Sequence, residues 1–208
     1  MKQFIEATSM AAPLLLNNID TDIISPMAAL NGAKGDELIG ALDKYAFAAI
    51  RYVEGDAEKQ EPNPEFSLND PTYGQAKILI VGENFGCGSS RETAPLGISA
   101  LGIRCIIGTT FGDIFFNNCF QCGILPIRVD KETLSSFVEQ CQQGEFSVDL
   151  VKQNILMPTG DSVHFETNEF KKNCLLKGFD DIEMSLDRLD EITEFQKNDQ
   201  QKRPWIYL

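Results

Sequence analysis

Residues 76–94 read AKILIVGENFGCGSSRETA, and in this stretch an apolar run passes directly into a loop of small residues. The run at 76–82 is short, rich in β-branched residues and bounded by glycine, which is typical of a strand buried on both faces. Two similar runs follow at 102–108 and 123–129. The stretch therefore opens a series of buried strands.

Helical patterns occupy the two intervals between these runs, at 91–101 and 111–122. The order β-α-β-α-β, with short connections, predicts a parallel sheet built by right-handed crossovers. The expected fold class is α/β. Pro126 lies in the third run, which places that strand at an edge of the sheet or makes the proline a strand end.

The next part of the chain predicts a helix, a group of antiparallel strands and a second helix. Residues 130–144 have apolar side chains at helical spacing between a capping Asp130 and a glycine. Residues 145–166 alternate like antiparallel strands around a turn at 158–161. Residues 168–178 form the second expected helix, which ends in glycine.

With 208 residues, the chain is expected to form a single domain over 1–208. Residues 51–75 are rich in proline, acids and amides, and we interpret them as a surface connection held by Phe66 and Tyr73. Residues 179–208 are expected to form a C-terminal helical extension. It is acidic, and the simplest interpretation is a solvated helix, with recognition of a basic partner as the alternative. Its narrow apolar stripe consists of Leu186, Leu189 and Ile192.

The net charge of -13 and the pI near 4.5 argue against binding to nucleic acid or to an anionic membrane. An anionic substrate must therefore meet a local cluster of donors. No apolar stretch approaches the length that spans a bilayer, and the N-terminus does not resemble a signal peptide. Six irregularly spaced cysteines favour reduced thiols, so we expect a cytoplasmic protein.

His164 is the single histidine, which excludes a multi-histidine metal site formed by this chain alone. Its alternating surroundings indicate an ordinary strand residue. Cys119 and Cys122 have a spacing found in metal sites, but they lie late in an apolar helix and have no second pair. We interpret them as buried thiols and expect no metal on this chain.

The loop at 82–94 follows one expected strand and leads into a helix, the position at which α/β sheets bind ligands. Gly86 and Gly88 permit close approach of the backbone. The loop also carries two hydroxyls and a guanidinium, from Ser89, Ser90 and Arg91. It matches GxGxxG only in part and lacks the Gly-Lys-Ser/Thr of a P-loop. A capped turn would also explain it, but an oxyanion site is the better physical interpretation.

A second motif, NNIDTDIISP at 17–26, on propensity alone makes an ordinary turn. Together with ENFGCGSSRE at 83–92, it resembles the small subunits of isopropylmalate isomerases (3-isopropylmalate dehydratases), relatives of the mobile C-terminal domain of aconitase. The resemblance covers nearly the whole chain and includes PNPEFSLN, FGDIFFNNCFQCGILPI, LLKGFDDIEMSLDRLDEI and the terminal RPW. It implies a swivelling β/β/α three-layer domain with a parallel-strand core.

The resemblance also implies roles for site residues. Ser89 would be the base that removes a proton from carbon, Ser90 would bind an oxyanion or substrate, and Arg91 would pair with a substrate carboxylate. A serine hydroxyl is only weakly acidic, so its alkoxide requires stabilisation by the N–H groups and positive charge of the loop. The remaining expected substrate-binding residues are Asp20, Thr21, Asp22 and Lys34.

In this family a 4Fe-4S cluster acts as a Lewis acid on the substrate hydroxyl, and its cysteine ligands belong to a large subunit. The resemblance therefore implies a large-subunit partner, no cofactor bound by this chain and a small dicarboxylate substrate. The implied reaction dehydrates 2-isopropylmalate and rehydrates the product to 3-isopropylmalate in leucine biosynthesis.

Some positions depart from the usual pattern of the family. Met27 stands where lysine is common, Thr93 replaces a usual histidine, and the loop after the first motif has Lys34 as its only cation. The enzymatic alternative is the same chemistry on a methylmalate or dimethylmalate. The alternative from another class is a non-catalytic partner module that kept the fold.

Overall fold

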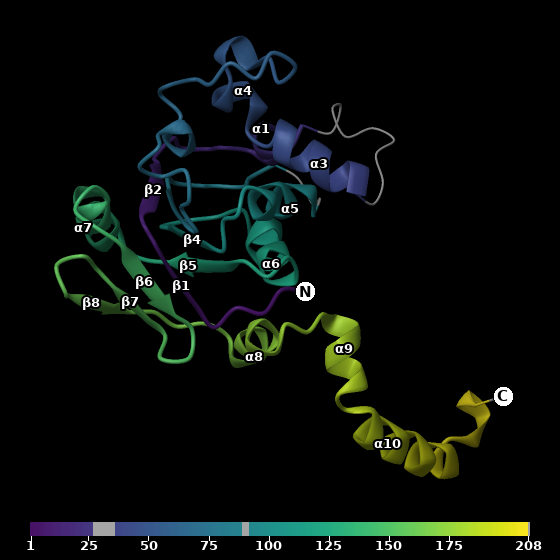
Figure 1. Cartoon of the computed structure of the whole chain (residues 1–208). Helices are drawn as coiled ribbons and strands as arrows, with labels where there is room; N and C mark the ends of the chain where they lie inside the picture. Colours follow the sequence, from purple (N-terminus) through teal and green to yellow (C-terminus); the bar gives the residue numbers. More distant parts are fainter. Residues whose placement is uncertain (27–35, 89–91, 208) are drawn as a thin grey trace.

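The computed structural model describes residues 1–26, 36–88 and 92–207, in which two four-stranded sheets form the centre of the protein (Figure 1). One sheet is parallel, as predicted, and has the order β2-β3-β4-β5. Pro126 lies in its edge strand β5, in agreement with the sequence interpretation. The strands of this sheet are β2 (Ala11–Leu14), β3 (Ile78–Val81), β4 (Cys105–Gly108) and β5 (Leu125–Arg128).

Strand β2 extends the predicted three-stranded parallel sheet to four strands. Its sequence is AAPL, in which small residues and a proline obscure the apolar signal of a strand. Pro13 is tolerated because β2 is the other edge strand, paired only with β3.

The second sheet is antiparallel and has the order β1-β6-β7-β8. The expected antiparallel group at 145–166 supplies three of its strands, and the N-terminal β1 pairs with β6. His164 ends the edge strand β8 and is exposed, so it is the strand residue expected from its surroundings. The strands are β1 (Glu6–Ser9), β6 (Phe146–Asp149), β7 (Asn154–Leu156) and β8 (Ser162–His164).

The predicted helices are present at the expected places, as α5, α6, α7 and α8. Asp130 caps α7 by accepting a hydrogen bond from the Thr133 N–H at 2.7 Å, and Gly178 ends α8 in the left-handed conformation. Helix α7 ends at Gln140, before the expected Gly144, because a short turn intervenes. The α-helices are α1 (Thr21–Ile24), α3 (Asp36–Tyr45), α4 (Ala48–Arg51), α5 (Thr93–Ala100), α6 (Asp113–Gln121), α7 (Lys131–Gln140), α8 (Glu169–Lys177), α9 (Asp181–Leu186) and α10 (Leu189–Lys202). Short 3-10 turns are η1 (Val53–Gly55), η2 (Ser67–Asn69) and η3 (Pro204–Ile206).

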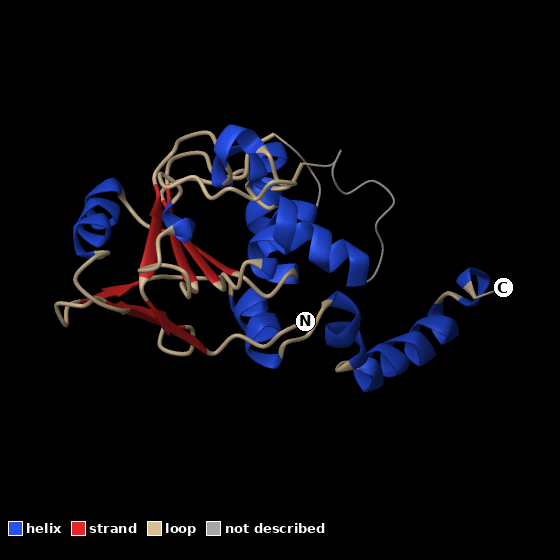
Figure 2. Ribbon diagram, turned by 45° about the horizontal axis from the view of Figure 1, so that its top comes forward, coloured by secondary structure: helices blue, strands red, loops and turns tan. Residues whose placement is uncertain are grey.

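Strand β3 is buried on both faces and separates two hydrophobic cores. Leu79 and Val81 pack into the core under the helices, whereas Ile78 and Ile80 pack into the core between the two sheets. Figure 2 shows the resulting layers, with the antiparallel sheet, the parallel sheet and the helices in succession. The expected β/β/α three-layer architecture is therefore confirmed.

Residues 51–75 cross the surface and bury three aromatic side chains, Tyr52 at 7%, Phe66 at 2% and Tyr73 at 5% exposure. The segment is thus anchored on the core beneath it. Among the described residues, no helix has the length and apolar character needed to cross a membrane.

Neighbouring residues of β7 allow a test of which face of the antiparallel sheet packs on the core. Ile155 is fully buried, whereas Leu156 is 48% exposed. We expect Ile155→Ala to lower the free energy of unfolding by about 2–5 kcal/mol, because it leaves a cavity between the sheets. The matched control Leu156→Ala should change it by no more than about 0.5 kcal/mol. Urea unfolding measures both, and equal losses would contradict the packing described.

Candidate active site at the carboxyl edge of the parallel sheet

Two motifs that are distant in the sequence lie side by side where the strands β2 and β3 end. The Gly86 N–H donates to the Ile19 carbonyl at 2.7 Å, and the Thr21 N–H donates to the Cys87 carbonyl at 3.0 Å. Asp20 and Cys87 are thereby paired as in a short parallel bridge. The Asp-Thr-Asp motif is thus held directly against the glycine-rich loop.

The glycine-rich loop is held on its other side by the loop that follows β4. The Gly112 N–H donates to the Phe85 carbonyl at 2.9 Å, and the Phe85 N–H donates to the Thr110 carbonyl at 3.2 Å. Because the three strands are parallel, their carboxyl ends bring these loops to one edge. The central loop is therefore fixed by backbone hydrogen bonds to both neighbours.

Asp20 has a structural role within this site. Its carboxylate caps the short helix α1 by accepting a hydrogen bond from the Ile23 N–H at 2.8 Å. Thr21 is buried at 4% exposure, and Asp22 is exposed. Of the three residues, Asp22 offers the most accessible side chain, and Thr21 meets the loop through its backbone.

Gly86 and Gly88 both have positive φ, of 72° and 95°. A Cβ at Gly86 would lie 2.2 Å from Cγ of Phe115 in α6, a distance that no side chain could occupy. At Gly88 a Cβ would lie 3.5 Å from Cβ of Asp20, which is ordinary contact. Gly86 is therefore required for both conformation and space, and Gly88 chiefly for conformation.

The structure brings five of the expected site residues into one region and leaves the others undescribed. The five are Asp20, Thr21, Asp22, Gly86 and Gly88. Helix α5 begins at Thr93, as expected for the helix that follows the loop. Ser89, Ser90, Arg91, Lys34 and Met27 lie outside the described residues.

Asparagines that were not singled out in the sequence also shape the edge. Asn17 Oδ1 accepts from the Glu83 N–H at 2.8 Å, and Asn84 Nδ2 donates to Asn18 Oδ1 at 2.9 Å. The Asn84 N–H donates to Thr110 Oγ1 at 2.8 Å. Asn18 and Asn84 both have positive φ, a conformation that asparagine tolerates well. The adjacent pair Asn17 and Asn18, which follows the apolar residues at the end of β2, is the sequence signal that could have indicated this role.

A hollow of about 410 Å³ lies between the beginning of the glycine-rich loop and α7. Lys131 and Glu83, which line it, form an ion pair with an Nζ–Oε1 distance of 2.5 Å. The hydrogen bond to Glu83 raises the pKa of Lys131 above its ordinary value. Because this ammonium group already has a carboxylate partner, it is poorly suited to receive an anionic ligand.

The Cys-x-x-Cys pair lies at the end of α6. Cys119 is fully buried, and burial raises its pKa well above the ordinary value. Cys122 is half-buried, and its burial raises the pKa to about 12. Within the described ranges, no three His, Cys, Asp or Glu side chains gather in a way that could hold a metal ion. Cys119 is therefore the buried thiol that its apolar helix indicated, whereas Cys122 is only partly buried.

The requirement for glycine at position 86 leads to a stability prediction. We expect Gly86→Ala to lower the free energy of unfolding by about 2–4 kcal/mol, because strain at positive φ adds to the clash with Phe115. Gly102→Ala is a matched control, since Gly102 has a φ of 86° and a Cβ added there would meet no atom within 4 Å. It should cost about 1 kcal/mol. Equal losses in urea unfolding would argue against the contact with Phe115.

Cys122 leads to a prediction for pH dependence. A pKa of about 12 leaves about one thiolate in ten thousand at pH 8, so alkylation by iodoacetamide should be slow. Because the thiolate reacts, the rate at Cys122 should rise about tenfold per pH unit from pH 8 to 11. Peptide mapping by mass spectrometry follows this thiol, and a short cysteine-containing peptide, whose rate levels off near pH 8.5, is the control. A plateau at pH 9 for Cys122 would contradict the effect of burial.

Comparison with known proteins identifies the family to which this chain belongs. Residues 1–132, which include both motifs, match the aconitase C-terminal domain. A solved 3-isopropylmalate dehydratase from Methanocaldococcus jannaschii shares the fold, with a TM-score of 0.63 at 23% identity over 91% of this chain and 99% of that one. The 3-isopropylmalate dehydratase small subunit of Agrobacterium fabrum is 44% identical over 99% of this chain and 100% of its own length. That of Rhizobium etli is 46% identical over 99% of both chains, and at this full-length similarity the chain belongs to the family of 3-isopropylmalate dehydratase small subunits.

Proposed function

We propose that this chain is the small subunit of a hydro-lyase that interconverts 2-isopropylmalate and 3-isopropylmalate by dehydration and rehydration, in leucine biosynthesis. Support comes from relatives of that name, which align over 99% of the chain. The observation that carries the proposal is the pairing of Asp20 with Cys87, which joins the Asp-Thr-Asp motif to the loop leading to Ser89. The family's two characteristic motifs thus meet at one edge of the sheet.

Ser89 is proposed as the base, Ser90 as a donor to an oxyanion and Arg91 as the partner of a substrate carboxylate. The described flanks support this assignment. Gly88 lies at positive φ beside Asp20, and helix α5 begins at Thr93. The N–H groups of a helix N-terminus favour anions, and a chain of net charge -13 needs such a local positive region for a dicarboxylate.

Asp20, Thr21, Asp22 and Lys34 are proposed to form the substrate-binding side of the site. Asp20 caps α1 and lies beside Gly88, so its contribution would include positioning of the loop. Asp22 is exposed on the same short helix. Its carboxylate would act on substrate hydroxyl groups more readily than on substrate carboxylates, because like charges repel.

The large subunit is proposed to carry a 4Fe-4S cluster, which would supply the Lewis acid for the substrate hydroxyl. The three most deeply buried cysteines of the present chain do not fit that cofactor. Cys105, Cys119 and Cys141 are buried, and burial raises the pKa of each thiol, whereas cluster ligands are thiolates. We therefore assign this chain the base and substrate-binding groups alone.

We further propose a cytoplasmic location. All six cysteines are free, as is usual in a reducing compartment. Biosynthesis of an amino acid from small diacids is consistent with that placement.

The decisive experiment purifies the chain with its large subunit under anaerobic conditions and follows the interconversion of 2- and 3-isopropylmalate. We expect Ser89→Ala to reduce kcat about 10²- to 10⁴-fold, because the proton-abstracting group is lost. Arg91→Lys should mainly raise KM, since an ammonium cannot form the planar two-point contact with a carboxylate. Chromatographic co-elution of the variants with the large subunit controls for assembly.

Full turnover by Ser89→Ala would refute the assignment of the base. A panel containing 2-methylmalate and dimethylmalate tests the substrate. Faster turnover of either acid would identify that acid, and not isopropylmalate, as the substrate. An assembled, cluster-loaded complex that transforms none of these acids would favour the non-catalytic module instead.

A further inference from the structure

The C-terminal arm, defined here as residues 179–207, extends away from the two sheets. It consists of α9, α10 and η3, and it projects on the side of the molecule where α5 and α6 lie (Figures 1 and 2). Its root is tied to the body by the ion pair between Lys177 and Asp187, at 2.5 Å, and by the ion pair between the Met1 ammonium group and Glu183, at 4.0 Å. The beginning of the arm is therefore anchored, and α10 continues outward.

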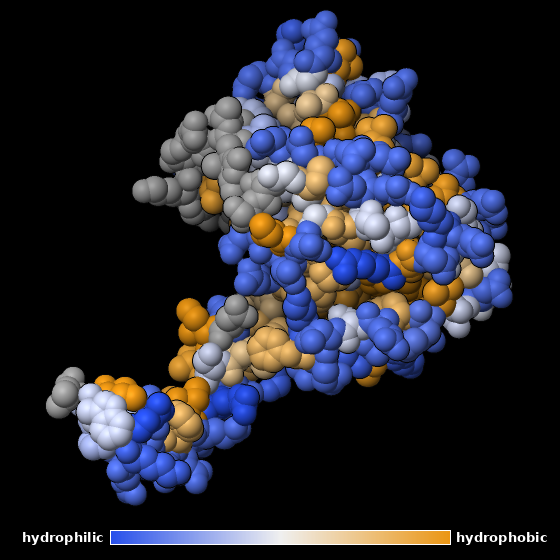
Figure 3. Space-filling view, turned by 180° about the vertical axis from the view of Figure 1, so that it is seen from behind, coloured by the Kyte–Doolittle hydropathy of each residue, from blue (hydrophilic) through white to orange (hydrophobic). Residues whose placement is uncertain are grey.

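The arm exposes large apolar side chains along one face of α10. Leu189, Ile192 and Phe195 recur at intervals of three residues, and their exposed fractions are 54%, 38% and 63%. This spacing places them on one stripe of the helix. Figure 3 shows apolar surface gathered along the arm.

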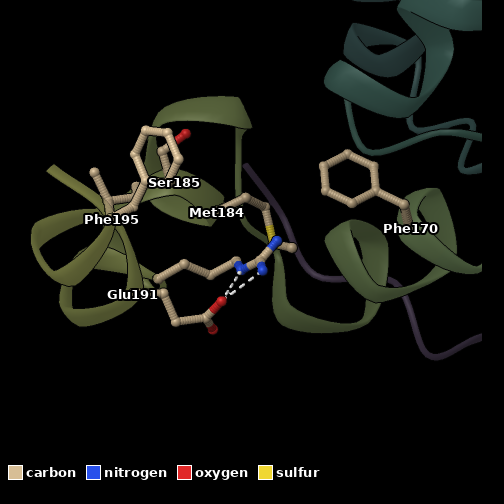
Figure 4. Close-up of a pocket in the computed structure, with 7 residues that line it drawn as sticks. Phe170, Met184, Ser185, Glu191 and Phe195 are labelled. Carbon is tan, nitrogen blue, oxygen red and sulfur yellow. Dashed lines mark hydrogen bonds and ion pairs between the residues drawn. The ribbon is translucent and has the colours of Figure 1, made fainter. Parts of the chain in front are cut away.

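The stripe continues into a hollow of about 460 Å³ between α8, α9 and α10. In Figure 4, Phe170 faces this space from α8, Met184 comes from α9, and Phe195 comes from α10. The exposed pair Arg188–Glu191, with an N–O distance of 2.6 Å, lines the same hollow. The arm thus offers both a ridge and an adjoining apolar recess.

The end of the arm has a defined structure that presents more apolar surface. Arg203 Nε donates to Asp199 Oδ1 at 2.7 Å, and the Tyr207 hydroxyl donates to Oδ2 at 3.0 Å. The hydrogen bond from Arg203 lowers the pKa of Asp199, which favours the charged form. This cluster holds η3 against α10, where Trp205 is 66% and Ile206 is 55% exposed.

A helix in this situation gains little stability from the body of the protein. Isolated helices of about 12–15 residues are marginal in water, and most helical stability in proteins comes from burial of an apolar face. Helix α10 has 14 residues, and its apolar stripe is exposed. Burial of that stripe on another surface would supply the missing stabilisation.

Charge distinguishes between the possible occupants. Residues 178–199 contain eight acids against Arg188 and Lys197, and the whole chain has a net charge of -13. A second copy would bring two acidic arms or two acidic bodies together, which is unfavourable. The complementary surface is an apolar groove with lysine and arginine at its rim.

We propose that the C-terminal arm docks in such a groove of the large subunit, with Leu189, Ile192 and Phe195 as the buried residues. The arm lies on the same side of the sheets as α5, which follows the candidate site loop, so one partner could contact both regions. This inference rests on the proposed function, because the large subunit is the partner that a small subunit implies.

The test measures binding of the full chain to its large subunit by isothermal titration calorimetry. The variant Leu189→Gln/Phe195→Gln removes apolar surface and keeps good helix formers. We expect its Kd to rise about 10- to 100-fold, as for loss of central apolar contacts. At saturating small subunit, kcat should stay at the wild-type value, because neither residue belongs to the candidate site.

The control Glu194→Gln/Lys197→Gln changes the opposite face of α10 and preserves net charge. Its Kd should remain within about twofold of wild type. Circular dichroism and the urea midpoint should be unchanged in both variants, since the substituted side chains are exposed.

An unchanged Kd for the apolar variant would overturn the proposal, as would failure of the wild-type chain to bind the large subunit. Sedimentation showing that the wild-type chain dimerises and that the same variant abolishes the dimer would assign the arm to a second copy and overturn it as well. If the wild-type complex forms through the arm but does not act on isopropylmalate, the activity proposal fails and the docking proposal stands.

Discussion

The complete burial of β3 is the constraint on which the rest of the structure depends. Ile78 and Ile80 require the antiparallel sheet on one face, while Leu79 and Val81 require the helices on the other. A strand enclosed in this way has no room for polar chemistry along its length. Polar groups can gather at the carboxyl end of β3, where the chain continues as the glycine-rich loop and contacts the loops after β2 and β4.

The core and the candidate site are mechanically connected at Gly86. Phe115, a buried residue of α6, occupies the space where a side chain at position 86 would lie. The same loop is held by backbone hydrogen bonds to Ile19 and from Gly112. Packing of the helical layer therefore determines where the loop passes Asp20, and a core substitution beneath α6 would act on the site through backbone position rather than through charge.

The sequence predicted the elements whose signals are local. The apolar runs of β3, β4 and β5, the Asp130 cap and the Gly178 helix end all depend on residues that are neighbours in the chain. Strand β2 was missed because Ala11, Ala12 and Pro13 give little strand signal, although their pairing with β3 buries the two alanines completely. The pairing of β1 with β6 joins distant segments, so no local pattern predicts its register. In the site, glycine and serine composition indicated an anion-binding loop, but the hydrogen bonds that place Asp20 beside Gly88 arise from the tertiary fold.

The arrangement separates two demands that oppose each other in an acidic protein. The proposed dicarboxylate substrate would need local N–H groups and positive charge, which we assign to the loop entering α5. Recognition of a basic partner benefits instead from excess negative charge, which the arm carries beside its apolar stripe. Because the arm leaves the body after α8, its charges can attract a partner without contributing carboxylates to the loop region formed by β2, β3 and β4. Affinity for the partner and electrostatics at the loop can then vary independently, which a single compact surface would not allow.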